Sequence, residues 1–286
     1  MRKKIIKKNQ NDITAIVLTY NEEKHIERCI ISLKNYVKDI ILIDSFSSDK
    51  TIEIAKKYKV KFYKRKFINQ STQINWGLKN IRFKTKWLLR IDADEYLTCD
   101  LKKKLTNCLQ FANKQINSIS FERKIKFLNK LLNYGATSPH KTLRVWRNGK
   151  GYCDKSLVDE QIITSGKSIH INGYLIDHNL KSLSWWINKH KKYAIREAND
   201  YILKTKKPSL NLYNLKIKSF TQKNHKYKIY YKLPIILRPL IFFFYSYVVK
   251  LGFLTGWQGF IFYFFQTLWF RFMVDLNIIR IFFKKK

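Results

Sequence analysis

Residues 13–23 read ITAIVLTYNEE, an apolar run that ends abruptly in polar and acidic side chains. Two further runs, DIILID at residues 39–44 and WLLRI at residues 87–91, also lead into a carboxylate, and a shorter run stands at residues 61–63. Short apolar runs of this kind are typical of strands that are buried on both faces in a parallel sheet.

The segments between these runs carry the helical period. After the first strand, apolar side chains recur three and four residues apart, at Ile26, Cys29, Ile30 and Leu33. A second helix is expected from Ile52 and a third over Gln73–Ile81. Alternating strands and helices predict an α/β fold with a mixed, mainly parallel sheet and helices on both faces.

Polar residues follow three of the predicted strands, at Tyr20–Glu23, Asp44–Ser48 and Asp92–Glu95. The carboxyl ends of parallel strands share one edge of a sheet, where ligands bind, so we expect these residues on one rim. Asp92 and Asp94 stand one residue apart, so that one carboxylate can hold a divalent cation and the other a neighbouring hydroxyl. A solvated acidic turn is the alternative.

Composition divides the chain into five parts. Residues 113–175, with several glycines, are expected to be loop-rich, and residues 181–233 begin with a helix over 182–204 and continue as a Lys-rich linker. The predicted parts are a basic N-terminal tail (1–12), a ligand-binding half (13–112), a second half of the same domain (113–180), the helix and linker (181–233) and an aromatic and basic segment (234–286).

Composition also limits the class of protein. The chain has 286 residues, of which 45% are hydrophobic, so a disordered chain is excluded. Its net charge of +37 favours nucleic acid, anionic lipid or phosphate-bearing substrates as partners, although Lys enrichment from an AT-rich genome is an equal explanation. The four cysteines have no zinc-like spacing, and no secretory signal follows Met1, so a cytoplasmic protein is expected.

The C-terminal segment mixes aromatic and basic residues. Such segments suit helices that lie in the head-group region of an anionic membrane. Residues 251–270 are uncharged and long enough for one membrane span, although their glycines and glutamines weaken that reading. Helices that complete the core or a dimer interface are the third alternative.

Three motifs together resemble a known family: TAIVLTYNEE (14–23), ILIDSFSSDKT (41–51) and WLLRIDADEYLT (87–98). They look like the inverting glycosyltransferases of family two, which have a nucleotide-sugar-binding GT-A fold. LRVWRNGKG (143–151), VDEQI (158–162) and later segments extend the resemblance to about residue 270, toward the branch of lipopolysaccharide-core β-glucosyltransferases.

The resemblance implies roles for individual residues. Carried over by position, the nucleotide-sugar would be bound by Thr19, Tyr20, Glu22, Asp44 and Asp92. Asp94 would bind Mg2+ or Mn2+ at the diphosphate, and Glu160 would be the general base. Related enzymes commonly carry His before this Glu, whereas Asp159 stands here and is the alternative base.

The implied reaction is metal-dependent transfer of a hexose with inversion. The best candidate donor is UDP-glucose, and the acceptor would be an envelope glycan or a lipid-linked acceptor such as lipopolysaccharide core, at the cytoplasmic face of the inner membrane. Attachment would be peripheral or through a single span. A polyprenyl-phosphate sugar transferase is the enzymatic alternative. The alternative outside enzymes is a nucleic-acid-binding protein that uses the positive charge.

Overall fold

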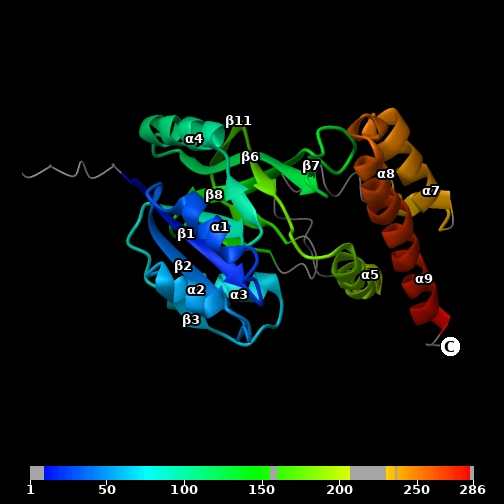
Figure 1. The fold of residues 1–286 in the computed structure, drawn as a ribbon, viewed down its shortest axis with the longest axis horizontal. Helices are drawn as coiled ribbons and strands as arrows, with labels where there is room; N and C mark the ends of the chain where they lie inside the picture. The colour runs from blue at the N-terminus through cyan, green and yellow to red at the C-terminus, as the bar shows by residue number, and fades with distance from the viewer. Residues whose placement is uncertain (1–9, 155–159, 207–229, 236, 284–286) are drawn as a thin grey trace, which may run out of the picture. The chain divides into compact units, whose positions relative to one another are not determined.

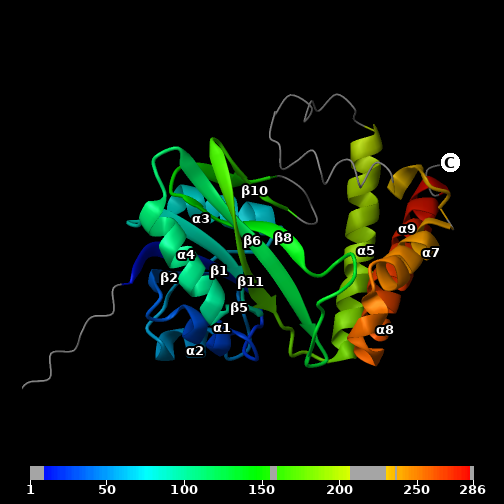
Figure 2. The same ribbon diagram turned by 90° about the horizontal axis from the view of Figure 1, so that it is seen from above.

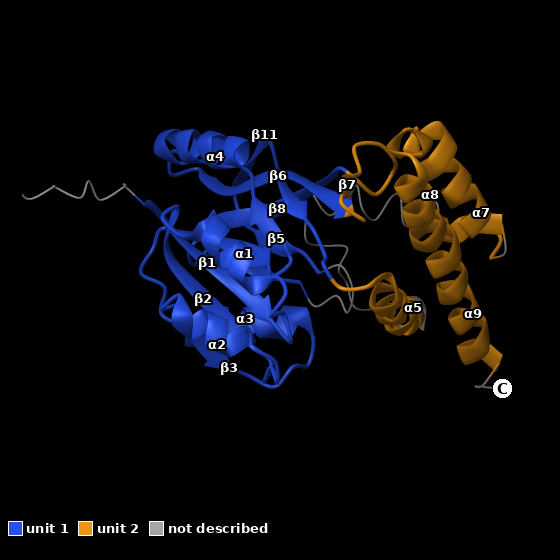
Figure 3. Cartoon of the chain, in the orientation of Figure 1, with its two compact units in different colours: residues 1–126, 139–180 blue, residues 127–138, 181–286 orange. Residues whose placement is uncertain are grey.

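The computed structural model describes residues 10–154, 160–206, 230–235 and 237–283 (Figure 1). The chain divides into two compact units (Figure 3). Unit 1 comprises residues 1–126 and 139–180, and unit 2 comprises residues 127–138 and 181–286. The predicted tail at residues 1–9 and most of the predicted linker, at 207–229, lie outside the described residues. The five predicted parts remain a prediction.

The first half of unit 1 confirms the predicted alternation of strands and helices. Its elements are β1 (Asn11–Thr19), α1 (Ile26–Leu33), β2 (Val37–Asp44), α2 (Thr51–Lys57), β3 (Lys61–Lys64), α3 (Gln70–Asn80) and β4 (Trp87–Asp92). β1 pairs in parallel with β2 and β4, and β2 pairs in parallel with β3. Helix α3 begins earlier than predicted because Asn69 and Thr72 form a capping box.

The second half of unit 1 is richer in strands than the sequence predicted. It contains β5 (Glu95–Leu97), α4 (Cys99–Phe111), β6 (Ile116–Phe127), β8 (His140–Arg147), β9 (Gly151–Cys153), β10 (Ile162–Thr164) and β11 (Lys167–Asp177). The expectation of a loop-rich segment over 113–175 was wrong, because glycines at turns such as Gly149 and Gly166 separate the strands rather than break them.

The main sheet is mixed. Along it the strands follow the order β3-β2-β1-β4-β8-β6-β11-β5. β8 is antiparallel to both β4 and β6, and β5 is antiparallel to β11, whereas β6 and β11 are parallel. The parallel half therefore continues directly into a half with antiparallel strands, which places β8 beside β4.

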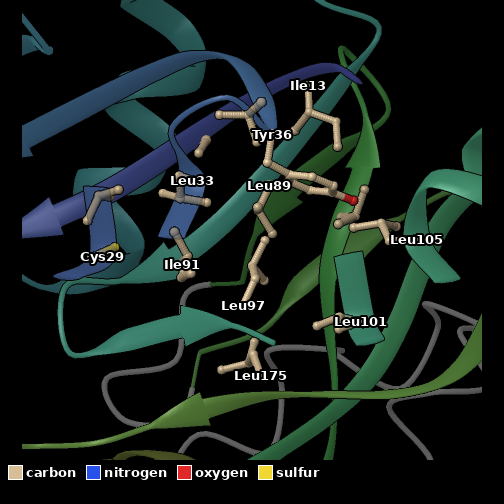
Figure 4. Close-up of a cluster of buried hydrophobic side chains, with 14 of the residues drawn as sticks. Ile13, Cys29, Leu33, Tyr36, Leu89, Ile91, Leu97, Leu101, Leu105 and Leu175 are labelled. Carbon is tan, nitrogen blue, oxygen red and sulfur yellow. The ribbon is translucent and has the colours of Figure 1, made fainter. Parts of the chain in front are cut away.

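Apolar side chains cover both faces of this sheet. Alternate residues of β1 and β4, among them Ile13 and Leu89, pack with Leu33 of α1 and Leu101 of α4 on one face (Figure 4). On the other face the core includes Ile74 of α3 and residues of β9 and β10, and Figure 2 shows α3 across the sheet from α1. The predicted placement of helices on both faces is confirmed.

Unit 2 is built from helices and the segment 127–138. Its elements are α5 (Leu183–Lys206), α7 (Leu237–Phe244), η2 (Tyr245–Val249), η3 (Gly252–Thr255), α8 (Trp257–Tyr263), η4 (Phe264–Trp269), α9 (Phe270–Phe283) and the short strand β7 (Lys130–Leu131). α5 and α9 pack through Ala194, Ala198 and Val274. Phe127 contacts Trp186 of α5 and Phe262 of α8 with ring-centroid distances of 5.9 and 5.3 Å.

The uncharged stretch 251–270 is not one helix. Leu251 and Gly256 both have positive φ angles, and they separate η3 from the helical elements on either side. Among the described residues, no helix combines the length and the apolar composition that crossing a bilayer requires.

The turn at Gly135 provides a test of packing in unit 2. Gly135 has φ +106°, its N–H donates to the carbonyl of Lys250, and an added Cβ would overlap the hydroxyl of Tyr263. Gly149 also has a positive φ, +76°, but has open space around it. We expect Gly149→Ala to cost about 1–2 kcal/mol from backbone strain alone, and Gly135→Ala to cost about 1–3 kcal/mol more from overlap.

Urea unfolding followed by tryptophan fluorescence measures both costs. Equal costs for the two substitutions would contradict the tight packing of Tyr263 on this turn.

Candidate active site

The carboxyl ends of three neighbouring strands form the predicted rim. Thr19 at the end of β1 is paired in register with Asp44 at the end of β2. On the other side of β1, Leu18 is paired with Asp92 at the end of β4. Both predicted carboxylates therefore flank the end of the first strand, and the prediction of a shared rim is confirmed.

Asp44 is completely buried and organises the loops at this rim. Its carboxylate accepts hydrogen bonds from Thr19 Oγ1 at 2.8 Å, from Ser47 N at 2.9 Å and from Ser47 Oγ at 2.6 Å. Asn21, in the left-handed conformation that Asn tolerates, donates its N–H to Ser47 Oγ and accepts from Ser48 N at 2.8 Å. These bonds tie the loops after β1 and β2 together.

Tyr20 and Glu22 occupy different environments on the first of these loops. The Tyr20 residue is 60% exposed and is free to meet a planar ligand. Glu22 accepts a hydrogen bond from Nδ1 of the buried His25 at 2.6 Å. His25 Nε2 accepts from the N–H of Leu180 at 2.7 Å, so the proton of this imidazole lies on Nδ1. His25 thus fixes Glu22 at the rim.

Asp94 lies between α1 and the segment that follows β11. Its Oδ2 accepts from Asn179 Nδ2 at 3.2 Å. Arg28 of α1 donates to the carbonyls of Asp94 and His178 and contacts the His178 ring at 2.9 Å. Burial, together with the Arg28 charge, lowers the pKa of His178 to about 4. His178 is therefore a packed neutral residue.

Asp92 and Glu95 share one guanidinium. Arg144 of β8 contacts Glu95 Oε1 at 2.6 Å and Asp92 Oδ2 at 3.4 Å. Glu95 Oε2 also accepts the N–H of Asp92 at 2.9 Å, which closes the turn that carries both aspartates. Arg123 lies 3.9 Å from Glu95 and donates to Asp177 at 3.1 Å. The turn is held by ion pairs from two other strands.

Sharing Arg144 separates the pKa values of the two carboxyls. Burial opposes ionisation of Asp92, but Arg144 and Arg90 outweigh it and hold the pKa of Asp92 well below its usual range. Burial raises the pKa of Glu95 to about 8, opposed by Arg144 and reinforced by the charge of Asp92. Asp92 therefore carries the negative charge of this pair at neutral pH.

Glu160 enters the same charged network through Arg90 of β4. Arg90 Nη2 donates to Glu160 Oε1 at 2.5 Å, and the Glu160 side chain is only 6% exposed. Burial raises the pKa of Glu160 above its usual range, while Arg90 opposes the shift. A carboxylate with a raised pKa is suited to accept a proton near neutral pH. Asp159, the alternative base, lies outside the described residues.

The donor set at the turn fits a divalent cation that is shared with a substrate. Among the described residues, no three His, Cys, Asp or Glu side chains converge as a complete metal cluster. Asp94 offers hard carboxylate oxygens, and its Oδ2 accepts a hydrogen bond from Asn179. Mg2+ is commonly held by one or two carboxylates together with substrate phosphates, so one aspartate on an accessible turn is enough.

Sequence reasoning missed the arginines that hold the site. Arg90 left a signal, because it is a charged residue inside the otherwise apolar run WLLRI. Arg28 left none, since it stands among polar positions of an amphipathic helix. Arg144 stands in the motif LRVWRNGKG, and its contacts with Asp92 and Glu95 depend on the pairing of β8 with β4.

Comparison with known proteins identifies the first half of the chain. Residues 14–151 match the family model of Glycosyl transferase family 2. This range begins in β1 and extends beyond β8, so it includes the rim and the turn of Asp92 and Asp94.

Two curated relatives and one solved structure extend the comparison. An uncharacterized glycosyltransferase of Rickettsia bellii is 25% identical over 212 residues, 69% of this chain and 70% of the relative. The lipopolysaccharide core biosynthesis glycosyltransferase LpsC of Rhizobium meliloti is 26% identical over 205 residues, 68% of this chain and 74% of LpsC. The mannosyltransferase PcManGT of Pyrobaculum calidifontis, solved with GDP-Man and Mn2+, aligns with a TM-score of 0.44 and 13% identity over 69% of this chain and 65% of that chain.

Proposed function

Because residues 14–151 are a glycosyl transferase family 2 domain, the protein is a glycosyltransferase, and we propose that it transfers a hexose from a nucleotide-sugar to an envelope glycan or lipid-linked acceptor, with inversion. The main support is the rim, where Asp44 at the end of β2 and Asp92 and Asp94 at the end of β4 lie on either side of β1. The likeness to LpsC makes lipopolysaccharide core the first acceptor to test, and UDP-glucose is the first donor.

In this proposal the first three loops hold the donor. Tyr20, exposed at the end of β1, stacks on the base, and Glu22 accepts from the base or ribose. Asp44, buried behind them, holds the loops in place through Thr19 and Ser47. Asp92, kept ionised by two arginines, accepts from a ribose hydroxyl. Asp94 holds Mg2+ or Mn2+ against the diphosphate. When bound, this cation would neutralise the charge that develops on the leaving nucleoside diphosphate.

Glu160 is the proposed general base. It removes the proton of the acceptor hydroxyl while that oxygen attacks C1 of the sugar from the face opposite the diphosphate. The new glycosidic bond forms as the C1–phosphate oxygen bond breaks, and the nucleoside diphosphate leaves with the bonding electrons. One displacement inverts the anomeric centre, and the proton remains on Glu160 until solvent removes it.

Unit 2 supports a lipid-linked acceptor at an anionic membrane surface. All three of its carboxylates, Glu197, Asp200 and Asp275, are buried. Large apolar side chains are exposed instead, among them Phe244 and Trp257. A surface of cations and exposed aromatic rings, without exposed anions, binds anionic head groups and buries its rings between them.

An apolar groove of about 300 Å³ lies in unit 2. It is lined by Pro239 and Leu240 of α7 and by Phe264, Leu268, Trp269 and Phe272 of η4 and α9. The lining is almost wholly apolar, so the groove suits a hydrocarbon chain rather than a sugar. The groove therefore supports a polyprenyl phosphate as the second candidate acceptor.

A donor and acceptor panel tests the proposal as a whole. UDP-, GDP- and dTDP-sugars are offered with Mn2+, with lipopolysaccharide core or polyprenyl phosphate as acceptor, and the anomeric configuration of the product is read by NMR. Transfer to polyprenyl phosphate alone would select the second candidate. Absence of transfer and of donor hydrolysis with every sugar would contradict the proposal.

Asp94→Ala is expected to reduce transfer by about 10²–10³-fold, because charge on the leaving diphosphate is no longer stabilised. Steady-state transfer at saturating Mn2+ measures the loss, and added Mn2+ does not restore the activity. Asp100→Asn is the matched control, since Asp100 is exposed and pairs with Lys104 of the same helix at 2.9 Å. Full wild-type activity after exhaustive chelation with EDTA would refute the metal role.

Glu160→Gln is expected to lower transfer by about 10²–10⁴-fold while UDP binding is retained, because the donor is held by other loops. Activity of the wild type should fall as the pH drops through the raised pKa of Glu160, where the base becomes protonated. Asp159→Asn should cost far less. If Asp159→Asn is inactive and Glu160→Gln is active, the base is Asp159.

Phe244→Ser is expected to weaken binding to vesicles that contain phosphatidylglycerol by about tenfold, since burying a phenyl ring contributes about 1.5 kcal/mol or more. Phe111→Ser removes an equally large exposed ring from unit 1 and should leave binding unchanged. Co-sedimentation with vesicles measures both variants. Equal effects, or equal binding to pure phosphatidylcholine, would contradict an anionic membrane surface in unit 2.

A further inference from the structure

Arg90 joins the donor side and the acceptor side of the site. It stands in the centre of the buried strand β4, and its side chain is 7% exposed. Its Nη2 donates to Glu160 Oε1 at 2.5 Å, and its Nε lies 3.7 Å from Asp92 Oδ1. No role follows for Arg90 from the family match, and a guanidinium inside an apolar strand has a large desolvation cost.

We propose that Arg90 is the positioning residue of the general base: its guanidinium orients the Glu160 carboxylate and keeps it ionised for proton removal. The inference rests on the proposed function and adds a residue to it. Arg90 Nη2 donates to Glu160 Oε1, and Nη1 donates to the Glu160 backbone carbonyl at 3.4 Å. Two N–H groups of one planar guanidinium therefore hold this residue in one orientation, which a single ammonium does not reproduce.

Among the described residues, Arg90 is the main source of positive charge near Glu160. Gln70 of α3 adjoins the Glu160 carboxylate, and the Arg90 guanidinium reaches it from β4. The other titratable groups near Glu160 in the described part of the chain are negative or neutral. They are the carboxyl of Asp92 on β4 and, near the end of β9, the carboxyl of Asp154 and the thiol of Cys153. Burial and Asp92 both raise the pKa of Glu160, and Arg90 opposes them. Without Arg90, the base would be protonated over a wider pH range.

Arg144 provides a matched comparison. Its side chain is buried to the same extent, 7% exposed, and it contacts Asp92 from the other side. It contacts Glu95 but not Glu160 in the hydrogen bonds and ion pairs of the described residues. Arg144→Gln therefore removes an equivalent charge from Asp92 without touching the base.

The test compares pH profiles of kcat for Arg90→Gln, Arg90→Lys, Arg144→Gln and Glu160→Gln. For Arg90→Gln we expect the acid limb to move to higher pH by about one to three units, the effect of removing an adjacent opposite charge. For Arg90→Lys we expect the limb to stay in place and kcat to fall by about tenfold or more. For Arg144→Gln the limb should not move.

Binding of UDP with Mg2+, measured by calorimetry, shows which variants are folded. An acid limb of Arg90→Gln at the wild-type pH overturns the inference. If Arg90→Gln does not fold, a wild-type kcat for folded Arg90→Lys overturns it, and a tenfold fall with unchanged UDP affinity supports it.

The outcomes separate this inference from the proposed function. A wild-type protein without transfer contradicts the function itself, and an active Glu160→Gln contradicts the base. If Glu160→Gln is inactive while Arg90→Gln shows no shift, only the role of Arg90 is wrong. In the Glu160→Gln background, Arg90→Gln should add little further loss of kcat, since the two residues act as one unit.

Discussion

The site depends on the cost of burying charge at the end of β4. A buried ion is tolerated only when it is paired and hydrogen-bonded. Here Glu160, Arg90, Asp92, Arg144 and Glu95 form a continuous chain in which carboxyl groups alternate with guanidinium groups and each arginine contacts two carboxyl groups. Removing one member takes a partner from each of its neighbours, so the chain fixes the turn of Asp92 and Asp94 as a unit.

This pairing explains why the fold needs its mixed half. Parallel strands β1, β2 and β4 bring three aspartates to one rim, and their negative charges repel one another. The compensating cation Arg144 comes from β8, which is antiparallel to β4, and Arg123 comes from β6. Because β8 runs antiparallel to β4, it places the Arg144 guanidinium beside the aspartates. A further parallel strand, joined through a β–α–β crossover, would not do so as directly.

The sequence predicted those parts of the fold that rest on local patterns. The apolar runs gave β1, β2 and β4, and the carboxylates that follow them gave the rim. The strands of residues 113–177 were not predicted for two reasons. β6, β8 and β11 interleave polar and apolar residues, and some of their pairings join residues more than forty positions apart in the chain, as Ser118 and Ser168 are. The partners Arg28 and Asn179 depend on such distant pairings, so no local pattern predicted them, whereas Arg90 left a signal as a charged residue inside the apolar run WLLRI.

The net positive charge of the chain can be interpreted only together with the positions of its carboxylates. Lys enrichment from a biased genome would raise the number of cations, yet it would not decide which side chains are buried. In unit 2, Glu197 contacts Arg271 and Asp275 contacts Arg238, both in the interior. The remaining surface is left to lysines and aromatic rings such as Trp257, which is 62% exposed. Exposed rings cost free energy in water, so this combination of exposed rings, cations and buried anions is the observation on which the proposed anionic lipid partner rests.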